Sequence, residues 1–198
     1  MNSQTKLHLT LQRDLTYLKQ NLAPTLPSGA LVEDLDYEAS SSDEEGHLHS
    51  RLSDDDVHSL AQALQSNDVF SGPLNLSKND LSDLSALYLK EAIQREGAKC
   101  FTKIVLAKNP RMQAKTGIYI GEALIANPSH PVNKLSFKGL DLQEDGLLRV
   151  LEACNANKNI EKLHLGFVSG RGLRLMSEVV RGNKSIKKIK FQEHPDSD

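Results

Sequence analysis

Six copies of a short apolar motif constrain the fold of this chain more than any other feature. The full motif is apolar-x-x-apolar-x-apolar, and its last two apolar positions alternate as in a short strand with one buried face. The middle positions are 39, 30, 31, 28 and 26 residues apart. They are Leu35, Leu74, Ile104, Leu135, Leu163 and Ile189, and the copy at Leu74 keeps only the last two apolar positions. The pattern predicts a regular succession of short strands.

A helical pattern recurs between these strands. Apolar residues stand at i, i+3 and i+4, as in Ile120, Ala123 and Leu124, and form one stripe of a helix. Alanine in the middle column lets neighbouring helices pack closely. An asparagine stands where each helix is expected to end, at a position that tolerates a left-handed backbone; these residues are Asn67, Asn127, Asn157 and Asn183. A strand and a helix in about 28 residues, repeated, predict parallel strands with right-handed crossovers.

The stretch from Leu74 to Leu81, followed by Leu89 and Ala92-Ile93, resembles a leucine-rich repeat of the ribonuclease-inhibitor class. Repeats of this class also occur in the Ran GTPase-activating protein and in the tropomodulin C-terminal domain. The resemblance implies an α/β solenoid, a horseshoe with parallel strands on the concave side and helices on the convex side. It also implies an asparagine that closes each strand turn. This residue is present as Asn79 and Asn109 but replaced by Leu140 and Val168, so the later turns are expected to be irregular.

Three regions are expected along the chain. Residues 1–29 form an N-terminal helix and a proline-containing linker, residues 30–191 form the solenoid with an acidic insert at 38–51, and residues 192–198 form a polar tail. The helix is predicted from a leucine stripe that Pro24 and Pro27 end; its members are Leu7, Leu11, Leu15, Leu18 and Leu22. This stripe either caps the first repeat, as repeat proteins require, or docks on another protein.

Composition narrows the function classes. A formal net charge of −2 and a pI near 6.4 give no case for binding nucleic acid, and no apolar run is long enough to span a membrane. The two cysteines, Cys100 and Cys154, are too few for a disulfide framework or a zinc site, which favours a reducing, cytoplasmic location. His47 and His49 in the insert are too few for a metal site. No catalytic or nucleotide-binding motif is present, so we expect no enzyme activity, cofactor or metal.

The insert contains three candidate phosphorylation sites. Ser40, Ser41 and Ser42 each have a carboxylate three residues later, an arrangement that acid-directed kinases recognise. The alternative is that the segment is simply an acidic, solubilising loop.

Charge is distributed unevenly along the chain. Residues 24–57 contain ten acidic residues and one arginine, whereas residues 158–191 contain nine basic residues and two acidic ones. Strand alternation places the residues beside each middle position on the concave face. Six basic side chains are predicted there, four of them in one column: Lys103, Lys134, Lys162, Lys188, His164 and Lys190. Lysine before a repeat leucine is common in this class, so the column has a purely structural alternative.

These observations favour a non-catalytic protein-protein interaction module, an adaptor or structural subunit of a hetero-complex. Its partner is expected to present an acidic segment to the six concave residues. The tropomodulin-like repeats suggest, as a special case, association with the cytoskeleton or a cilium. The resemblance to the Ran GTPase-activating protein suggests a regulator of a small GTPase as the alternative, although none of that family's catalytic residues can be matched to this chain.

Overall fold

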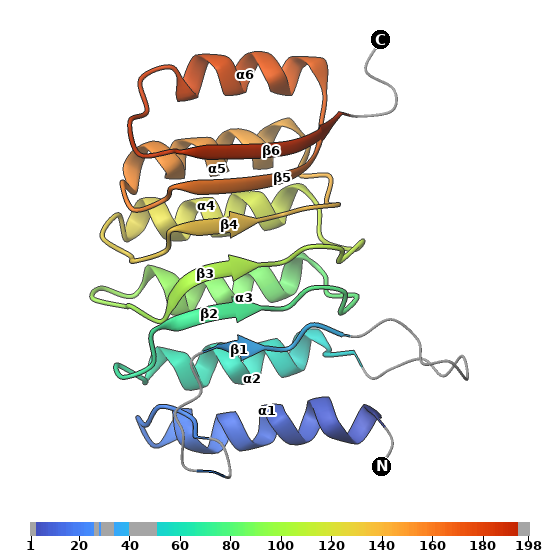
Figure 1. Cartoon of the computed structure of the whole chain (residues 1–198), viewed down its shortest axis with the longest axis vertical. Coiled ribbons are helices and arrows are strands. Elements are labelled where there is room, and N and C mark those ends of the chain that lie inside the picture. The colour runs from blue at the N-terminus through green and yellow to red at the C-terminus, as the bar shows by residue number, and fades with distance from the viewer. Residues whose placement is uncertain (1–2, 26–27, 29–33, 40–50, 194–198) are drawn as a thin grey trace.

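Helices and strands alternate along the computed structural model, which describes residues 3–25, 28, 34–39 and 51–193 (Figure 1). The helices are α1 (Ser3–Lys19), α2 (Asp54–Gln65), α3 (Asp83–Gln94), α4 (Ala114–Ala126), α5 (Gln143–Ala156) and α6 (Gly170–Val180). The strands are β1 (Leu35–Asp36), β2 (Gly72–Asn75), β3 (Phe101–Val105), β4 (Lys134–Ser136), β5 (Lys162–Val168) and β6 (Lys188–Glu193).

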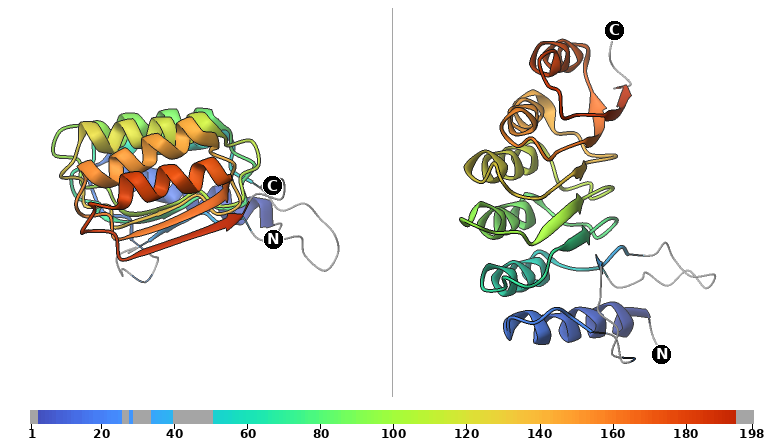
Figure 2. Two further views of the ribbon diagram at one scale, coloured as in Figure 1. Left: turned by 90° about the horizontal axis from the view of Figure 1, so that it is seen from above. Right: turned by 60° about the vertical axis from the view of Figure 1, so that its left-hand side comes forward.

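The six strands form one parallel sheet in chain order, β1-β2-β3-β4-β5-β6. The helices form a second layer along one face of this sheet, and the stack bends with the helices on its outer side (Figure 2). Each strand is too short to bury its apolar face alone, so the repeats must stack to build a continuous core. The predicted α/β solenoid, with strands on the concave side and helices on the convex side, is confirmed.

The middle residues of the six motifs lie side by side in the sheet. Leu35 pairs with Leu74, and the row continues through Ile104, Leu135, Leu163 and Ile189 in unbroken register. The first five are at most 1% exposed. Ile189 is only partly buried, because β6 is the last strand of the sheet. The repeat predicted from motif spacing is therefore the structural repeat.

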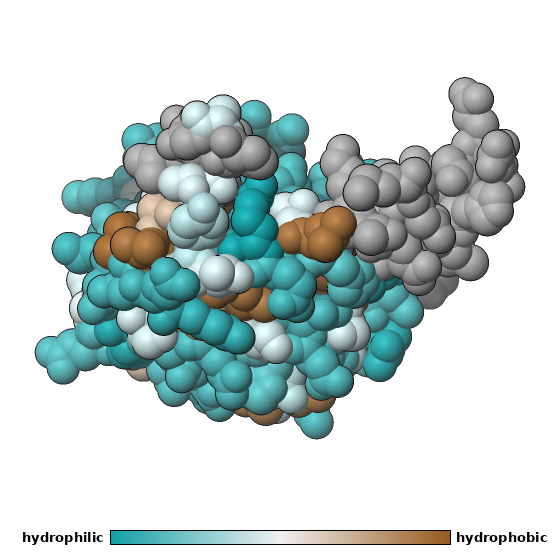
Figure 3. All heavy atoms as spheres, turned by 90° about the horizontal axis from the view of Figure 1, so that it is seen from below, coloured by the Kyte–Doolittle hydropathy of each residue, from teal (hydrophilic) through white to brown (hydrophobic). Residues whose placement is uncertain are grey.

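Helix α1 covers the first repeat. Leu11, Leu15 and Leu18 belong to the apolar core, and the buried Asp14 accepts a 2.8 Å hydrogen bond from the hydroxyl of Tyr37, which directly follows β1. The leucine stripe is therefore used for capping. It ends earlier than predicted: α1 stops at Lys19, and Leu22 is 47% exposed. The surface at this end of the solenoid is largely hydrophilic, with a few separate apolar groups (Figure 3).

Two buried asparagines join neighbouring repeats at the carboxyl ends of the strands. The amide nitrogen of Asn79 donates to the carbonyl of Tyr37 in the preceding repeat (2.6 Å), and its oxygen accepts the Leu52 N–H (2.9 Å). The Asn109 oxygen accepts the N–H groups of Asn79 (2.9 Å) and Leu81 (3.1 Å). These bonds satisfy buried backbone groups that the sheet leaves unpaired.

Two turns lack this asparagine. At Leu140 the turn keeps the regular path, because Gly139 adopts a positive φ (77°) as Lys78 and Lys108 do in the earlier turns. The turn at Val168 is irregular, as predicted. β5 runs on to Val168, and its register with β6 shifts between His164 and Phe167. Gly166 permits this path, because a Cβ atom there would lie 1.9 Å from the carbonyl oxygen of Leu140. The Phe167 N–H then donates to that oxygen at 3.1 Å.

The asparagines at the helix ends do not adopt the left-handed backbone expected of them. Asn127 and Asn157 follow α4 and α5 with φ values of −123° and −92°. Their side chains reach the preceding repeat instead: Asn127 donates to the carbonyl of Ile93 and Asn157 to that of His130, both at 2.9 Å. Because the amide is needed to join repeats, this role rather than backbone freedom explains the recurring residue.

Candidate functional site

A lysine ladder crosses the concave face of the sheet. We use this name for Lys103, Lys134, Lys162 and Lys188, which pair directly with one another across β3, β4, β5 and β6. Neighbouring parallel strands are about 4.8 Å apart, so the backbones of the four lysines follow one another at about that spacing. Lys134 is half-buried and the other three are exposed. The ladder predicted from strand alternation is thus present in register.

A second column on the concave face, formed by the residue after each middle position, is less exposed and less charged than the ladder. Ser136, His164 and Lys190 pair across β4, β5 and β6. Ser136 is buried and His164 is half-buried, whereas Lys190 is exposed. The structure therefore brings His164 and Lys190 beside the ladder, as predicted, and together the six residues make one basic surface.

Like charges on this surface repel one another. Partial burial, and then the neighbouring Lys103, Lys162 and Lys190, lower the pKa of Lys134. Partial burial also lowers the pKa of His164, with Lys134 and Lys190 adding to the effect. No described carboxylate forms an ion pair with a member of the ladder. A carboxylate from another molecule would relieve this repulsion.

The other half of the concave face is acidic and internally paired. The Asn75 amide on β2 donates to Asp36 Oδ1 on β1 (3.0 Å) and to Glu38 Oε2 (3.1 Å). Glu38 also forms a 2.6 Å ion pair with Lys78, and Lys78 and Asn75 together lower its pKa. The charge gradient along the chain is therefore also a gradient across the sheet, from acidic at β1 to basic at β6.

Two aspartates have roles inside the fold that sequence reasoning missed. Asp54, the first residue of α2, accepts hydrogen bonds from the hydroxyls of Ser82 and Ser85 at the start of α3. Asp83, the first residue of α3, accepts the hydroxyl of Thr116 in α4 at 2.6 Å. The sequence did contain a signal for this role, since the two aspartates stand at equivalent positions at the start of consecutive helices. Since both carboxylates are engaged in hydrogen bonds at the start of the next helix, they are not candidate catalytic groups.

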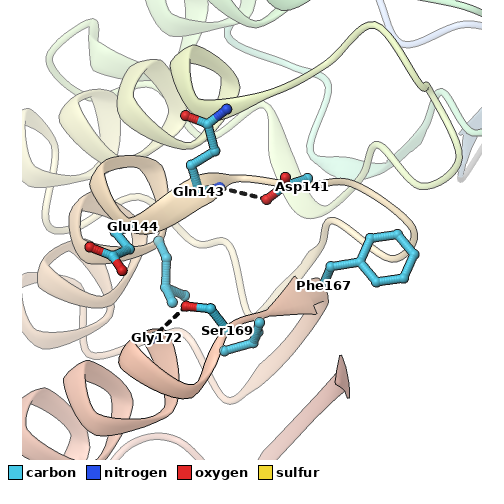
Figure 4. A pocket seen from close by; sticks show the side chains of 8 residues that line it. Asp141, Gln143, Glu144, Phe167, Ser169 and Gly172 are labelled. Atoms are coloured by element: carbon cyan, nitrogen blue, oxygen red, sulfur yellow. Dashed lines mark hydrogen bonds between the residues drawn. The ribbon is translucent and has the colours of Figure 1, made fainter. Parts of the chain in front are cut away.

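A cavity of about 310 Å³ lies where α5 and α6 begin (Figure 4). It is lined by Asp141, Gln143, Glu144, Leu147, Phe167, Val168, Ser169 and Gly172. Asp141 accepts the Gln143 N–H at 3.0 Å, Glu144 lies 3.1 Å from Arg171, and Ser169 caps α6. Asp141 and Ser169 are thus engaged where the two helices begin, and Glu144 is engaged in the ion pair with Arg171.

A cysteine and a histidine meet inside the core. Cys100 Sγ lies 3.8 Å from His130 Nε2, and the two residues are 2% and 0% exposed. Burial raises the pKa of Cys100 to about 12 and lowers that of His130 to about 4. The thiol therefore stays protonated and shielded from solvent, which is opposite to what a nucleophilic cysteine requires.

The remaining predicted sites lie outside the described residues. These are the candidate phosphorylation sites Ser40, Ser41 and Ser42; His47 and His49, which were not predicted to bind a metal, lie in the same segment. Within the described ranges, no group of three or more histidine, cysteine or carboxylate side chains is arranged to hold a metal ion. None of the helices described combines the length and the apolar character needed to cross a membrane.

Comparisons with known proteins identify the fold only. No protein-family model and no curated protein matches the chain. Among solved structures, the tropomodulin C-terminal domain of Caenorhabditis elegans is similar with a TM-score of 0.64 and 12% identity, over 87% of this chain and 92% of that one. Leiomodin-1 actin-binding site 2 is similar with a TM-score of 0.61 and 16% identity, over 86% of this chain and 87% of that one. These likenesses confirm the predicted leucine-rich-repeat fold.

Proposed function

We propose that this chain is a protein-binding module whose lysine ladder holds an acidic, extended segment of a partner protein. One observation carries the proposal: four lysines stand in unbroken register without a described carboxylate to pair with them. The partner is a second protein in a hetero-complex. We propose no enzyme activity, since the described polar groups of the cavity and the core serve the fold.

The spacing of the ladder sets the size of the partner segment. Three gaps of about 4.8 Å span about 14 Å, which an extended chain covers in about five residues. Each exposed ion pair contributes about 0.2–1 kcal/mol. Two or three carboxylates therefore stabilise the complex modestly, and they also steer its formation at low salt.

A cytoskeletal partner is the form of this proposal that the fold neighbours favour. The leiomodin-1 structure is described as an actin-binding site, so filamentous actin is the first partner to test. We propose a cytoskeleton-associated role on this ground. A ciliary location and regulation of a small GTPase have no supporting observation in the site or in these neighbours, and we do not propose them.

The test reverses two charges in the middle of the ladder. Lys134→Glu with Lys162→Glu is compared with a matched control, Lys115→Glu with Arg174→Glu, whose exposed residues lie on α4 and α6. The probe is a fluorescein-labelled heptaglutamate peptide, and its affinity is measured by fluorescence anisotropy at low and raised salt. Both variants change the net charge equally, so a difference between them reports position.

We expect the ladder variant to bind the peptide about tenfold more weakly than the control, which corresponds to about 1.4 kcal/mol. Equal affinities for the two variants would contradict the proposal. Co-sedimentation with filamentous actin tests the cytoskeletal form separately. If the wild-type chain binds the peptide but does not pellet with actin, the ladder proposal stands and actin is excluded as the partner. Circular dichroism of both variants confirms that they are folded.

A further inference from the structure

The last repeat exposes apolar residues that every earlier repeat buries. The third motif position is at most 2% exposed in each of the first five repeats, where it is Tyr37, Leu76, Leu106, Phe137 and Leu165. In β6 this position is Phe191, and it is 45% exposed. Ile189, two residues earlier on the same face of the strand, is only partly buried. The core side of β6 is thus apolar, as in the earlier repeats, but no described element packs over it.

Helix α6 also leaves apolar side chains uncovered at this end of the solenoid. A shallow, open groove of about 380 Å³ lies between α6 and β6 and is lined by Leu173, Met176, Ser177, Val180, Arg181 and Ile189. In the interior of the solenoid, the next helix and strand fill this place. At the other end, α1 buries Leu11, Leu15 and Leu18 against the first repeat. Leu9 and Leu22 are exposed there, but they are separate groups on a largely hydrophilic surface (Figure 3). The two ends are therefore not equivalent.

β6 also presents a free strand edge. Among the described strands it is last in the sheet and pairs on one side only, with β5. The N–H and C=O groups on its outer edge are available to another strand, which is the requirement for binding by strand addition. Along β6 the side chains alternate as Lys188, Ile189, Lys190 and Phe191, so charge faces the concave side and apolar groups face the core side.

Charge identifies what can occupy this edge. On its inner side, Lys188 lies opposite Lys162, and Lys190 lies opposite His164. Arg181 in the groove adds a further cation. A second copy joined through the same edge would bring these like charges together, which is unfavourable. A strand with carboxylates opposite the two lysines would instead form favourable cross-strand pairs.

We propose that the outer edge of β6 binds a partner segment in which acidic and apolar residues alternate, as a seventh strand. Its backbone pairs with β6, its carboxylates lie beside Lys188 and Lys190, and its apolar side chains cover Ile189 and Phe191. This site is separate from the one proposed above. The acidic segment on the ladder runs across the strands, whereas this segment runs along one strand at the end of the solenoid, and the two share only Lys188.

The test uses three labelled octapeptides and the full chain. One alternates glutamate and valine, one alternates glutamate and serine, and one alternates lysine and valine. We expect the glutamate–valine peptide to bind about tenfold more tightly than either of the others, because only it supplies both charge and apolar cover. In hydrogen exchange, the bound peptide should protect the amides of β6 and leave those of β3 unchanged.

Two variants separate this edge from the ladder. Lys190→Glu, at an exposed position, should weaken binding of the glutamate–valine peptide, and adding Phe191→Ser should bring the loss to about tenfold. Lys134→Glu with Lys162→Glu should change this binding by less than about threefold. Melting curves check that the edge variants remain folded, and Lys190→Glu alone supplies the test if the double variant does not.

Three results would overturn the inference. Equal binding of the glutamate–serine peptide would mean that only charge is recognised. Protection centred on β3 and β4 would place the peptide on the ladder. A chain that sediments as a dimer, with β6 protected before any peptide is added, would show that a second copy occupies the edge. None of these results depends on whether heptaglutamate binds the ladder, so the two proposals can fail separately.

Discussion

The buried histidine His130 is expected to make the stability of this protein fall in mild acid. Its side chain is fully buried, its Nδ1 atom has no hydrogen-bond partner, and its ring lies tilted against Phe101 with centroids 6.5 Å apart. A protonated imidazole would place an uncompensated charge in this apolar site. Burial therefore lowers the pKa of His130 from its ordinary 6.5 to about 4.

The sign and size of the effect follow from proton linkage. Between pH 6.5 and pH 4 the unfolded chain binds a proton at His130 that the folded chain does not, so lowering the pH favours unfolding. A difference of one unit between the pKa of the folded chain and that of the unfolded chain corresponds to 1.36 kcal/mol of stability. The fall from 6.5 to about 4 therefore corresponds to a loss of about 3 kcal/mol, complete near pH 4.

Urea unfolding followed by circular dichroism between pH 7 and pH 4 measures this loss. Other groups titrate in the same range, so the wild type is compared with His130→Phe, which retains an aromatic ring of similar size and cannot be protonated. We expect the stability difference between the two proteins to shift by about 3 kcal/mol in favour of the variant as the pH falls. A constant difference across this range would refute the burial argument.

Three further changes test the repeat architecture. Asn109→Leu gives the third repeat the leucine that the fourth repeat has at Leu140. It should cost about 2–6 kcal/mol in urea unfolding, because the N–H groups of Asn79 and Leu81 lose their acceptor. Leu163→Ala should cost about 2–5 kcal/mol by leaving a cavity, and an unchanged melting temperature would contradict the repeat register. Deleting residues 40–49, which lie outside the described residues, should leave the circular dichroism spectrum nearly unchanged because a polar, acidic insert contributes few buried contacts.

The strand register and the lysine ladder could be predicted from the sequence. Side chains of a strand alternate between two faces, so the apolar middle residue fixes the face of its neighbours. Once Leu135 and Leu163 are assigned to the core, Lys134 and Lys162 must lie on the opposite face. The turn asparagines Asn79 and Asn109 were also visible as repeated letters at equivalent positions. The register, the ladder and the turn asparagines are all local properties, because they follow from the alternation of side chains along a strand and from the spacing of the repeats.

The exposure of the two ends was decided by the tertiary structure alone. Leu165 and Phe191 occupy the same motif position, yet one is buried and the other is 45% exposed. His130 has no sequence signal for its burial, since the repeats that enclose it lie about 30 residues away on either side. Helix-end asparagines such as Asn127 likewise bond to the preceding repeat rather than adopting a left-handed turn. In each case the determining neighbour is another repeat, and burial depends on whether that neighbour is present, which no local pattern encodes.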